Sequence, residues 1–595
     1  MIDKSISGLS SRRLFKQVPT IQFSPEIEQC PQCGQPLQVL KTETRNVFTL
    51  HIGKFVAHHT IYKCSRCKSA SSYPSQELNS IVPKCSNFGY DVLVYVGKAI
   101  YQRYQTSVEV KGELNALNVP ISSSEVNYLA QIFIIYLAIA HRNITNKIND
   151  AFHNNGGYIL HIDSTMEGSS PHLMSGLDEL SKFVLFNVKM PSENSIYVIP
   201  FLENIRQKFG NPLALVSDMG KAMISAATEV FLDTPLYICH FHFLRDIGKD
   251  LLEKYYAYIR TTLKKHGIST QLRYRLRQYS KDKFDKLEIN LDKMIQATTN
   301  QLLDEHFIYC LCYTLIVWAL DGKSEGNGFG FPFDRPHYEF YQRLNQVAKV
   351  LECYLQSNKF TLTSKARKII ETLRDDLTPL ISDEVCKENV ATLEPKMKTF
   401  DNLRIAMKIA LPDSKKGIND MGKEVDMKTI EQQLEKFRTE LINSHGYNTD
   451  KEYQKMIGQI DKYWDKLFAP PIIIKTPAGL KTIQPQRTNN IMEQFFRDLK
   501  KSHRRTTGNN SIAKKLQTMI ADTPLIKNME NESYMNILLG EKTTLDEVFA
   551  QIDYDIIKEE RKKNKKIEEK IPKKIIQLIK KQNVPEIFLT LCNVS

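Results

Sequence analysis

Long apolar runs are missing from this sequence, and their absence excludes several classes of protein. The most apolar stretch, Ile132–Ala140, is much shorter than the roughly 20 residues that a membrane-spanning helix needs. The opening residues, MIDKSISGLSSRRLF, lack the apolar segment of a secretory signal peptide. We therefore expect a soluble intracellular protein without a membrane partner. Its 11 cysteines should be reduced thiols or metal ligands.

Acidic residues are in short supply relative to basic ones, which indicates a polyanionic partner. The chain has 81 Lys and Arg against 67 Asp and Glu, a formal net charge of +14. At 42% hydrophobic and 25% charged residues, the composition is that of a globular protein. Because 595 residues exceed what one core accommodates, we expect a multidomain protein, of α/β class.

Four cysteines form two Cys-x-x-Cys pairs with the spacing of zinc knuckles. The segment between the pairs is rich in β-forming residues, and 47–62 predicts a hairpin. Four thiolates complete a tetrahedral structural site, so residues 1–85 are predicted to form a zinc ribbon with an all-cysteine ligand set. The ligands would be Cys30, Cys33, Cys64 and Cys67.

Helical periodicity dominates residues 86–150. Predicted helices at 90–104 and 108–117 precede a turn and a third helix, which Ser122 caps. This order favours a helix-turn-helix that binds DNA. A plain helical connector is the alternative, because 126–140 is very apolar and should be mostly buried.

Strand and helix patterns alternate from residue 156 to 245, which predicts an α/β core. Two buried strands, Tyr158–Ile162 and Leu213–Ser217, end on Asp163 and Asp218. Functional groups of such cores gather at the carboxyl ends of strands. The other predicted elements are a strand at 183–188, helices at 195–209 and 221–230, and a strand at 236–239.

Strands largely disappear between residues 246 and 485, where charged amphipathic segments predict an all-helical insertion. The core is predicted to resume at 486–525, where RTNNIMEQFFRDLK forms a helix that carries Glu493. The remainder, 526–595, is predicted to be a basic helical tail. Its charge run is either a solvated face or a non-specific phosphate contact.

Two strand-end aspartates and a helical glutamate provide hard oxygen ligands, which suit Mg²⁺ or Mn²⁺. Two such ions at one site activate an attacking oxygen and stabilise the leaving oxygen of a phosphodiester. We therefore predict a two-metal site that acts on DNA. Its catalytic and metal-binding residues would be Asp163, Asp218 and Glu493.

Four motifs, in this order, resemble those of Mutator-like and related bacterial insertion-sequence transposases. They are HIDSTMEG, LVSDMGKAM, LYICHFHFLRDI with its Cys239-x-x-His242, and RTNNIMEQFFRDLK. The resemblance implies a DDE catalytic core of the RNase H-like fold, interrupted by a large helical insertion. It implies DNA cleavage at element ends and strand transfer into target DNA. It also implies a homodimer or larger assembly on terminal repeats and target DNA, at the nucleoid in the cytoplasm of a prokaryote or in the nucleus of a eukaryote.

Several residues near the catalytic motifs are assigned supporting roles. Asn490, one helical turn before Glu493, would hold that carboxylate or contact the DNA backbone. Cys239 and His242 are too few to bind zinc by themselves, and we expect them to pack behind the site or contact the scissile DNA. The basic residues that should meet phosphates are Arg497, Lys500, Lys501, Arg504 and Arg505.

Two other functions fit the same residues. A domesticated, transposase-derived DNA-binding regulator would keep the zinc ribbon and helix-turn-helix but would not need all three carboxylates. A metal-dependent nuclease would share the metal site without the strand-transfer step. Only the resemblance separates this nuclease from a transposase.

Overall fold

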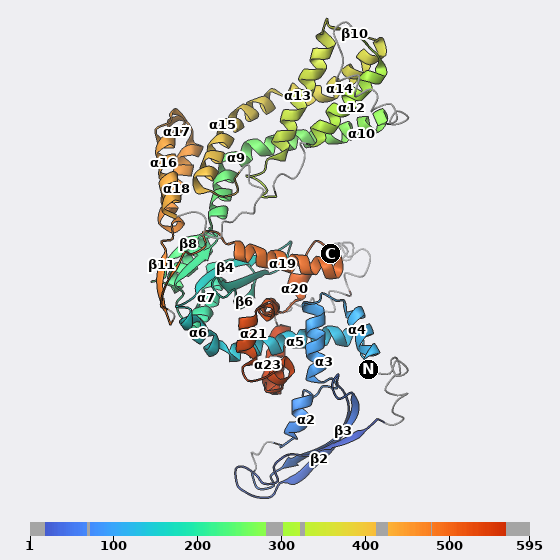
Figure 1. The fold of residues 1–595 in the computed structure, drawn as a ribbon, viewed down its shortest axis with the longest axis vertical. Helices are drawn as coiled ribbons and strands as arrows, with labels where there is room; N and C mark the ends of the chain where they lie inside the picture. Colours follow the sequence, from blue (N-terminus) through green and yellow to red (C-terminus); the bar gives the residue numbers. More distant parts are fainter. Residues whose placement is uncertain are drawn as a thin grey trace, which may run out of the picture.

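The fold is mixed α/β, with helices predominating. A computed structural model describes residues 18–67, 72–280, 301–321, 328–411, 427–477, 479–566 and 577. Figure 1 shows a central sheet with a long helical body on one side and a small β-ribbon at the opposite end. Most of the predicted basic run that follows residue 566 lies outside the described residues.

The β-ribbon contains β1 (Thr20–Phe23), β2 (Gln38–Phe48) and β3 (Lys54–Lys63). Strands β2 and β3 pair antiparallel, as the predicted hairpin requires, and β1 adds parallel to β3. A short helix, α2 (Gln76–Ile81), buries Leu78 against this sheet. The hairpin extends well beyond the predicted 47–62, because residues 38–46 pair as an exposed strand.

Three helices follow: α3 (Tyr90–Tyr101), α4 (Ser107–Ala116) and α5 (Ser123–Asn143). The side chain of Ser122 caps α5, as predicted. Helix α5 is long and apolar enough to cross a membrane by length and composition, but 67% of its apolar window is buried inside the protein. It is therefore a central core helix, which presents polar side chains to solvent only in its first turns and at its last two residues.

Helix α5 joins parts of the chain that the sequence suggested as separate domains. The described C-terminal elements are η2 (Thr523–Glu530), α21 (Glu532–Leu539), α22 (Leu545–Ala550) and α23 (Tyr554–Lys566). Of these, η2, α22 and α23 pack against α5, and α21 packs on η2 and α22. The buried His141 lies 2.9 Å from the hydroxyl of Tyr534 and 3.0 Å from the carbonyl of Leu185. One hydrophobic core thus runs from α3 through the sheet to the C-terminal helices.

The central sheet has the order β6-β5-β4-β7-β8. Strands β4, β7 and β8 are parallel, whereas β5 and β6 are antiparallel to their neighbours. Helix α6 (Thr145–Asn154) leads into the sheet, and the helices α7 (Ser195–Phe209) and α8 (Lys221–Val230) have their predicted bounds. Strand β5 was not predicted. The strands are β4 (Ile159–Thr165), β5 (His172–Asp178), β6 (Val184–Met190), β7 (Ala214–Ser217) and β8 (Leu236–Ile238).

The helical body has a hydrophobic core of its own, formed between α9 and α18. The predicted all-helical segment 246–485 also contains two β pairs, β9 (Gln301–Leu303) with β10 (Phe360–Leu362) and β11 (Ile472–Thr476) with β12 (Gly479–Ile483). The second pair forms because the β-branched run IIIKT meets GLKTI across a tight turn. The helices of the helical body are α9 (His240–Lys265), α10 (Ile268–Ser280), α12 (Glu305–Asp321), α13 (Pro336–Gln356), α14 (Ser364–Ile381), α15 (Glu384–Met407), α16 (Met427–Ile442), α17 (His445–Thr449) and α18 (Lys451–Leu467).

The chain then returns to the sheet as α19 (Asn490–Thr507) and α20 (Ala513–Thr518). Helix α19 packs against β4 and buries Met492, Phe495 and Phe496 in the central core. This return brings the predicted catalytic glutamate to the sheet that carries both aspartates.

The central core should lose stability in mild acid through His141. Burial lowers the pKa of His141 to about 4, whereas the same side chain titrates near 6.5 in the unfolded chain. The stabilising contribution is therefore complete above about pH 6.5 and is lost as the pH falls toward 4. Going from about pH 7.5 to about pH 5 should cost about 2 kcal/mol relative to His141→Gln.

The measurement is hydrogen-exchange protection of α5 amides in the two proteins. Tryptophan fluorescence would report the wrong part of the chain, because Trp318 and Trp464 both lie in the helical body. Comparison with the variant removes the contribution of other titrating groups to the pH dependence of stability. One such group is Asp522, whose pKa is raised to about 6 by burial. Equal pH dependence in both proteins would contradict this assignment.

Candidate functional site

The two predicted strand-end aspartates lie side by side at one edge of the sheet. In the parallel pair of β4 and β7, His161 is the partner of Val216, so Asp163 and Asp218 fall opposite each other two residues further on. Neighbouring strands lie about 4.8 Å apart, which brings the two carboxylates into mutual range. Asp163 is itself inside β4, because that strand continues to pair with β5 at Ser175.

Glu493 approaches the aspartates from the first turn of α19, and a histidine lies between them. Nδ1 of His242 is 2.6 Å from Oδ1 of Asp218, and Nε2 of the same ring is 3.6 Å from Oε1 of Glu493. One imidazole therefore links two of the three predicted catalytic residues, Asp218 and Glu493.

Burial shifts the pKa values of the ionisable groups at this edge. The pKa of Asp163 is raised well above its usual range, first by burial and then by the neighbouring Asp218. Burial also raises the pKa of Glu493, although His242 acts in the opposite direction. Burial lowers the pKa of His242, but Cys239 and Asp218 together raise it to about 11. Arg245 and Arg497 also lower the pKa of Glu493, so the edge combines buried carboxylates with nearby cationic side chains.

A buried asparagine that the sequence analysis did not select fixes this arrangement. The side chain of Asn489 donates from Nδ2 to the carbonyl of Ile162 at 2.9 Å and lies 3.4 Å from Oδ1 of Asp218. Its Oδ1 is 2.9 Å from Nδ1 of His161, and its backbone N–H donates to Sγ of Cys239 at 3.1 Å. Asn489 is fully buried just before α19.

Asn490, the residue predicted to support Glu493, occupies the first position of α19 and is half-buried. The paired asparagines were visible in the sequence, but the sequence did not show which of the two side chains faces inward.

The buried Glu179 extends the network around Asn489 and His161. Its carboxylate lies 3.0 Å from Nε2 of His161 and accepts a hydrogen bond from the backbone of Gln486.

Cys239 and His242 lie at the same edge as Asp218. Ser217 of β7 pairs with Ile238 of β8, which places Cys239 beside Asp218 at the start of α9. The ligand atoms of Asp218, Cys239 and His242 all lie within 4.8 Å of one another. The structure thus adds a third ligand to the two that the sequence offered.

The predicted phosphate-binding residues form a basic stripe on the solvent side of α19. This face is opposite the buried Met492, Phe495 and Phe496. The guanidinium of Arg505 also lies over the ring of Tyr104, 5.7 Å from its centroid. The exposed residues of the stripe are Arg497, Lys500, Lys501, Arg504 and Arg505.

A second candidate centre lies in the β-ribbon. Sγ of Cys30 is 4.0 Å from that of Cys67, and Sγ of Cys33 is 3.5 Å from that of Cys64. Tetrahedral zinc with Zn–S bonds of about 2.3 Å separates its sulfurs by about 3.8 Å, so the four thiols fit a structural zinc ion. The first knuckle turns through Gly34, whose φ of 68° favours glycine.

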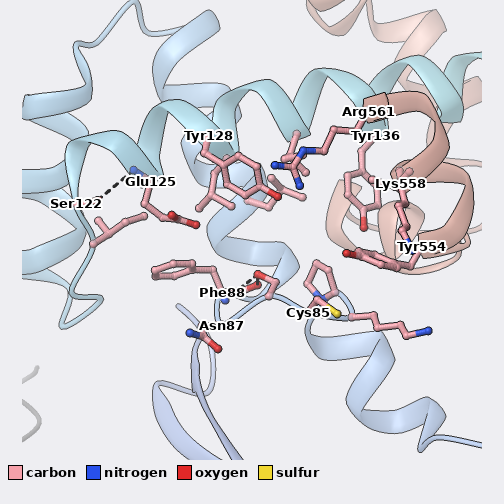
Figure 2. A pocket seen from close by; sticks show the side chains of 18 of the residues that line it. Cys85, Asn87, Phe88, Ser122, Glu125, Tyr128, Tyr136, Tyr554, Lys558 and Arg561 are labelled. Atoms are coloured by element: carbon pink, nitrogen blue, oxygen red, sulfur yellow. Dashed lines mark hydrogen bonds between the residues drawn. The ribbon is translucent and has the colours of Figure 1, made fainter. Parts of the chain in front are cut away.

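A cavity of about 350 Å³ lies away from both centres, between residues 83–88, the start of α5 and α23. Figure 2 shows Tyr128, Tyr136 and Tyr554 around it. Arg561 covers the ring of Tyr128 at 4.7 Å. Among the residues that line this cavity, Glu125 is the one with a carboxylate.

Purified full-length protein should contain about one tightly held zinc ion per chain in the ribbon. Cys30→Ser should release that ion and unfold the ribbon, because metal binding supplies folding free energy there. The central core should stay folded, since the ribbon has a separate small core. Elemental analysis gives the zinc content, and hydrogen exchange locates the unfolding. Full zinc content in the variant would disprove the ligand assignment.

Comparisons with known proteins assign this chain to no family. No protein-family model matches it, and a search of curated proteins finds no match.

Proposed function

We propose that this protein is a DDE transposase that cleaves DNA at the ends of a mobile element and joins those ends to target DNA. The observation that carries the proposal is the meeting of three carboxylates from distant segments. Asp163 and Asp218 come from adjacent parallel strands, and Glu493 comes from a helix beyond the helical body. Their motifs are the ones that resemble Mutator-like and related insertion-sequence transposases.

The sheet supports an RNase H-like core. Its first strand, β4, is central, and the candidate site residues lie near the carboxyl ends of β4, β7 and β8. The helical body would be the insertion before the glutamate: it begins directly after β8, at α9, and ends at α18, which packs on β8.

Side chains of this protein would position the metal ions and the DNA. Asp163, Asp218 and Glu493 would hold two Mg²⁺ or Mn²⁺ ions, which when bound supply charge neutralisation and activation of the attacking oxygen. Asn489 keeps α19 in register with the strands. The basic stripe of α19 would hold the phosphates that flank the scissile bond.

Two alternatives use the same residues. A nuclease would cleave without joining, and a DNA-binding regulator would do neither. Retention of all three carboxylates at one edge favours catalysis over regulation. An assay with labelled element ends and a separate target duplex distinguishes the three, because strand transfer gives a joined product that hydrolysis does not.

The carboxylates should be required for chemistry and not for DNA binding. Asp163→Asn, Asp218→Asn and Glu493→Gln should each lower Mg²⁺-dependent cleavage by more than about a hundredfold, since even residues behind metal ligands cost roughly 10–100-fold. Duplex affinity measured in a chelator should be almost unchanged.

Asp498→Asn is the matched control, because it removes a carboxylate from the exposed side of the same helix, where Asp498 pairs with Lys527. Its cleavage rate should equal that of the natural sequence. Undiminished cleavage in all three site variants would refute the proposed site.

The α19 stripe should supply affinity for any duplex. Each lost phosphate contact should reduce the slope of log affinity against log salt by about 0.9. Lys500→Gln and Arg504→Gln should therefore weaken binding to every sequence alike. Lys436→Gln removes one exposed charge from α16 and serves as the control. A salt slope that these two variants leave unchanged would exclude phosphate contact by the stripe.

Sequence preference should instead depend on the exposed start of α5. Asn127 and Gln131 are exposed there, whereas residues 132–141 of the helix are buried and cannot enter a groove. Asn127→Ala with Gln131→Ala in the full chain should reduce the preference for terminal repeat over random duplex. Competition binding at fixed salt measures this ratio. An unchanged ratio would leave the helix with a purely structural role.

A further inference from the structure

Three ligands of different chemical softness converge at the edge of β7 and β8. They are the carboxylate of Asp218, the thiol of Cys239 and the imidazole of His242, with ligand atoms within 4.8 Å of one another. Cys239 and His242 are buried, and the sequence holds them in place through the N-terminal turn of α9. This set differs from the oxygen set formed with Asp163, because sulfur and imidazole are ligands that Mg²⁺ disfavours and Zn²⁺ prefers.

The groups behind these ligands are arranged as in a metal centre. Nδ1 of His242 faces Asp218 at 2.6 Å, while Nε2 faces the carboxylate of Glu493 at 3.6 Å. A carboxylate on the far nitrogen orients a metal-bound histidine and raises its basicity. The thiol of Cys239 accepts a hydrogen bond from the backbone of Asn489 at 3.1 Å, which would orient the sulfur.

We propose that Asp218, Cys239 and His242 form a binding site for a transition-metal ion of the zinc class. Three protein ligands leave a fourth tetrahedral position open, as in reactive rather than structural zinc sites. The ribbon cysteines are a separate centre, and the two clusters share no residue.

Occupation of this site controls the catalytic edge, a consequence that rests on the proposed function. Zinc on Asp218 removes that carboxylate from the pair it forms with Asp163. It also engages Glu493 through His242. The zinc-bound chain therefore cannot assemble the oxygen site for Mg²⁺, and zinc acts as an inhibitor of cleavage.

The binding test uses full-length, metal-free protein dialysed against Zn²⁺. Elemental analysis should give about two zinc ions per chain, one for each cluster. Cys239→Ser and His242→Gln should each lose one of them. Cys310→Ser is the matched control, since Cys310 is a buried cysteine of α12 outside both clusters, and it should retain both ions.

X-ray absorption at the zinc edge of the unaltered protein gives a readout that needs no variant. A second site adds nitrogen and oxygen neighbours at about 2.0–2.1 Å to the sulfur shell at about 2.3 Å. One zinc ion with sulfur neighbours alone, or a second ion that persists in both Cys239→Ser and His242→Gln, overturns the site.

A cleavage assay at fixed Mg²⁺, with and without added Zn²⁺, tests the regulatory consequence. We expect zinc to suppress cleavage in the natural sequence in proportion to occupancy of the second site. If the second zinc binds but the chain that holds only the ribbon zinc never cleaves with Mg²⁺, the proposed function fails while the site stands. If cleavage occurs and is unaffected by full occupancy, the inhibitory role is overturned.

Discussion

One buried amide determines how the candidate site is assembled. Asn489 connects the start of α19 to the backbone of β4 and, through its own N–H, to Cys239 at the end of β8. A buried polar group that loses its partner costs about 1–3 kcal/mol, so a shift of α19 along the sheet would break several such bonds together. Glu493 lies one helical turn further on, and its position therefore follows from that of Asn489.

The helical body reduces the loop-closure entropy that the chain loses when α19 packs on the sheet. It leaves the sheet at His240 and returns at Leu467, and Nε2 of His240 lies 2.6 Å from the carbonyl of Leu467. Because the body has its own core, its folding brings its two ends together and shortens the effective loop between the sheet and α19. Arg487 strengthens the junction by donating to the carbonyls of Met407 and Lys408 at the end of α15.

Local patterns predicted those elements that local chemistry determines. Helices α7 and α8 and the strand that ends before Asp218 follow from apolar periodicity and turn residues, whereas β4 continues past Asp163 because it pairs with β5. Strand β5 was not predicted because HLMSGLD has no β-branched residue. Its strand conformation depends on pairing with β4 and β6. The hydrogen bonds of Asn489 were not predicted for a related reason. The residues that it contacts are distant in sequence, and only the folded sheet brings them together.

The edge of the sheet presents two ligand sets that overlap at a single residue. In the proposed function Asp218 joins Asp163 in an oxygen set for hard ions, and in the proposed zinc site it joins Cys239 and His242 in a mixed set for softer ions. Strand β7 places one aspartate at this position, so the sets exclude each other. His242 belongs to α9, which also packs along α15. An ion held by His242 would therefore lie against the first turn of the helix that leads into the helical body.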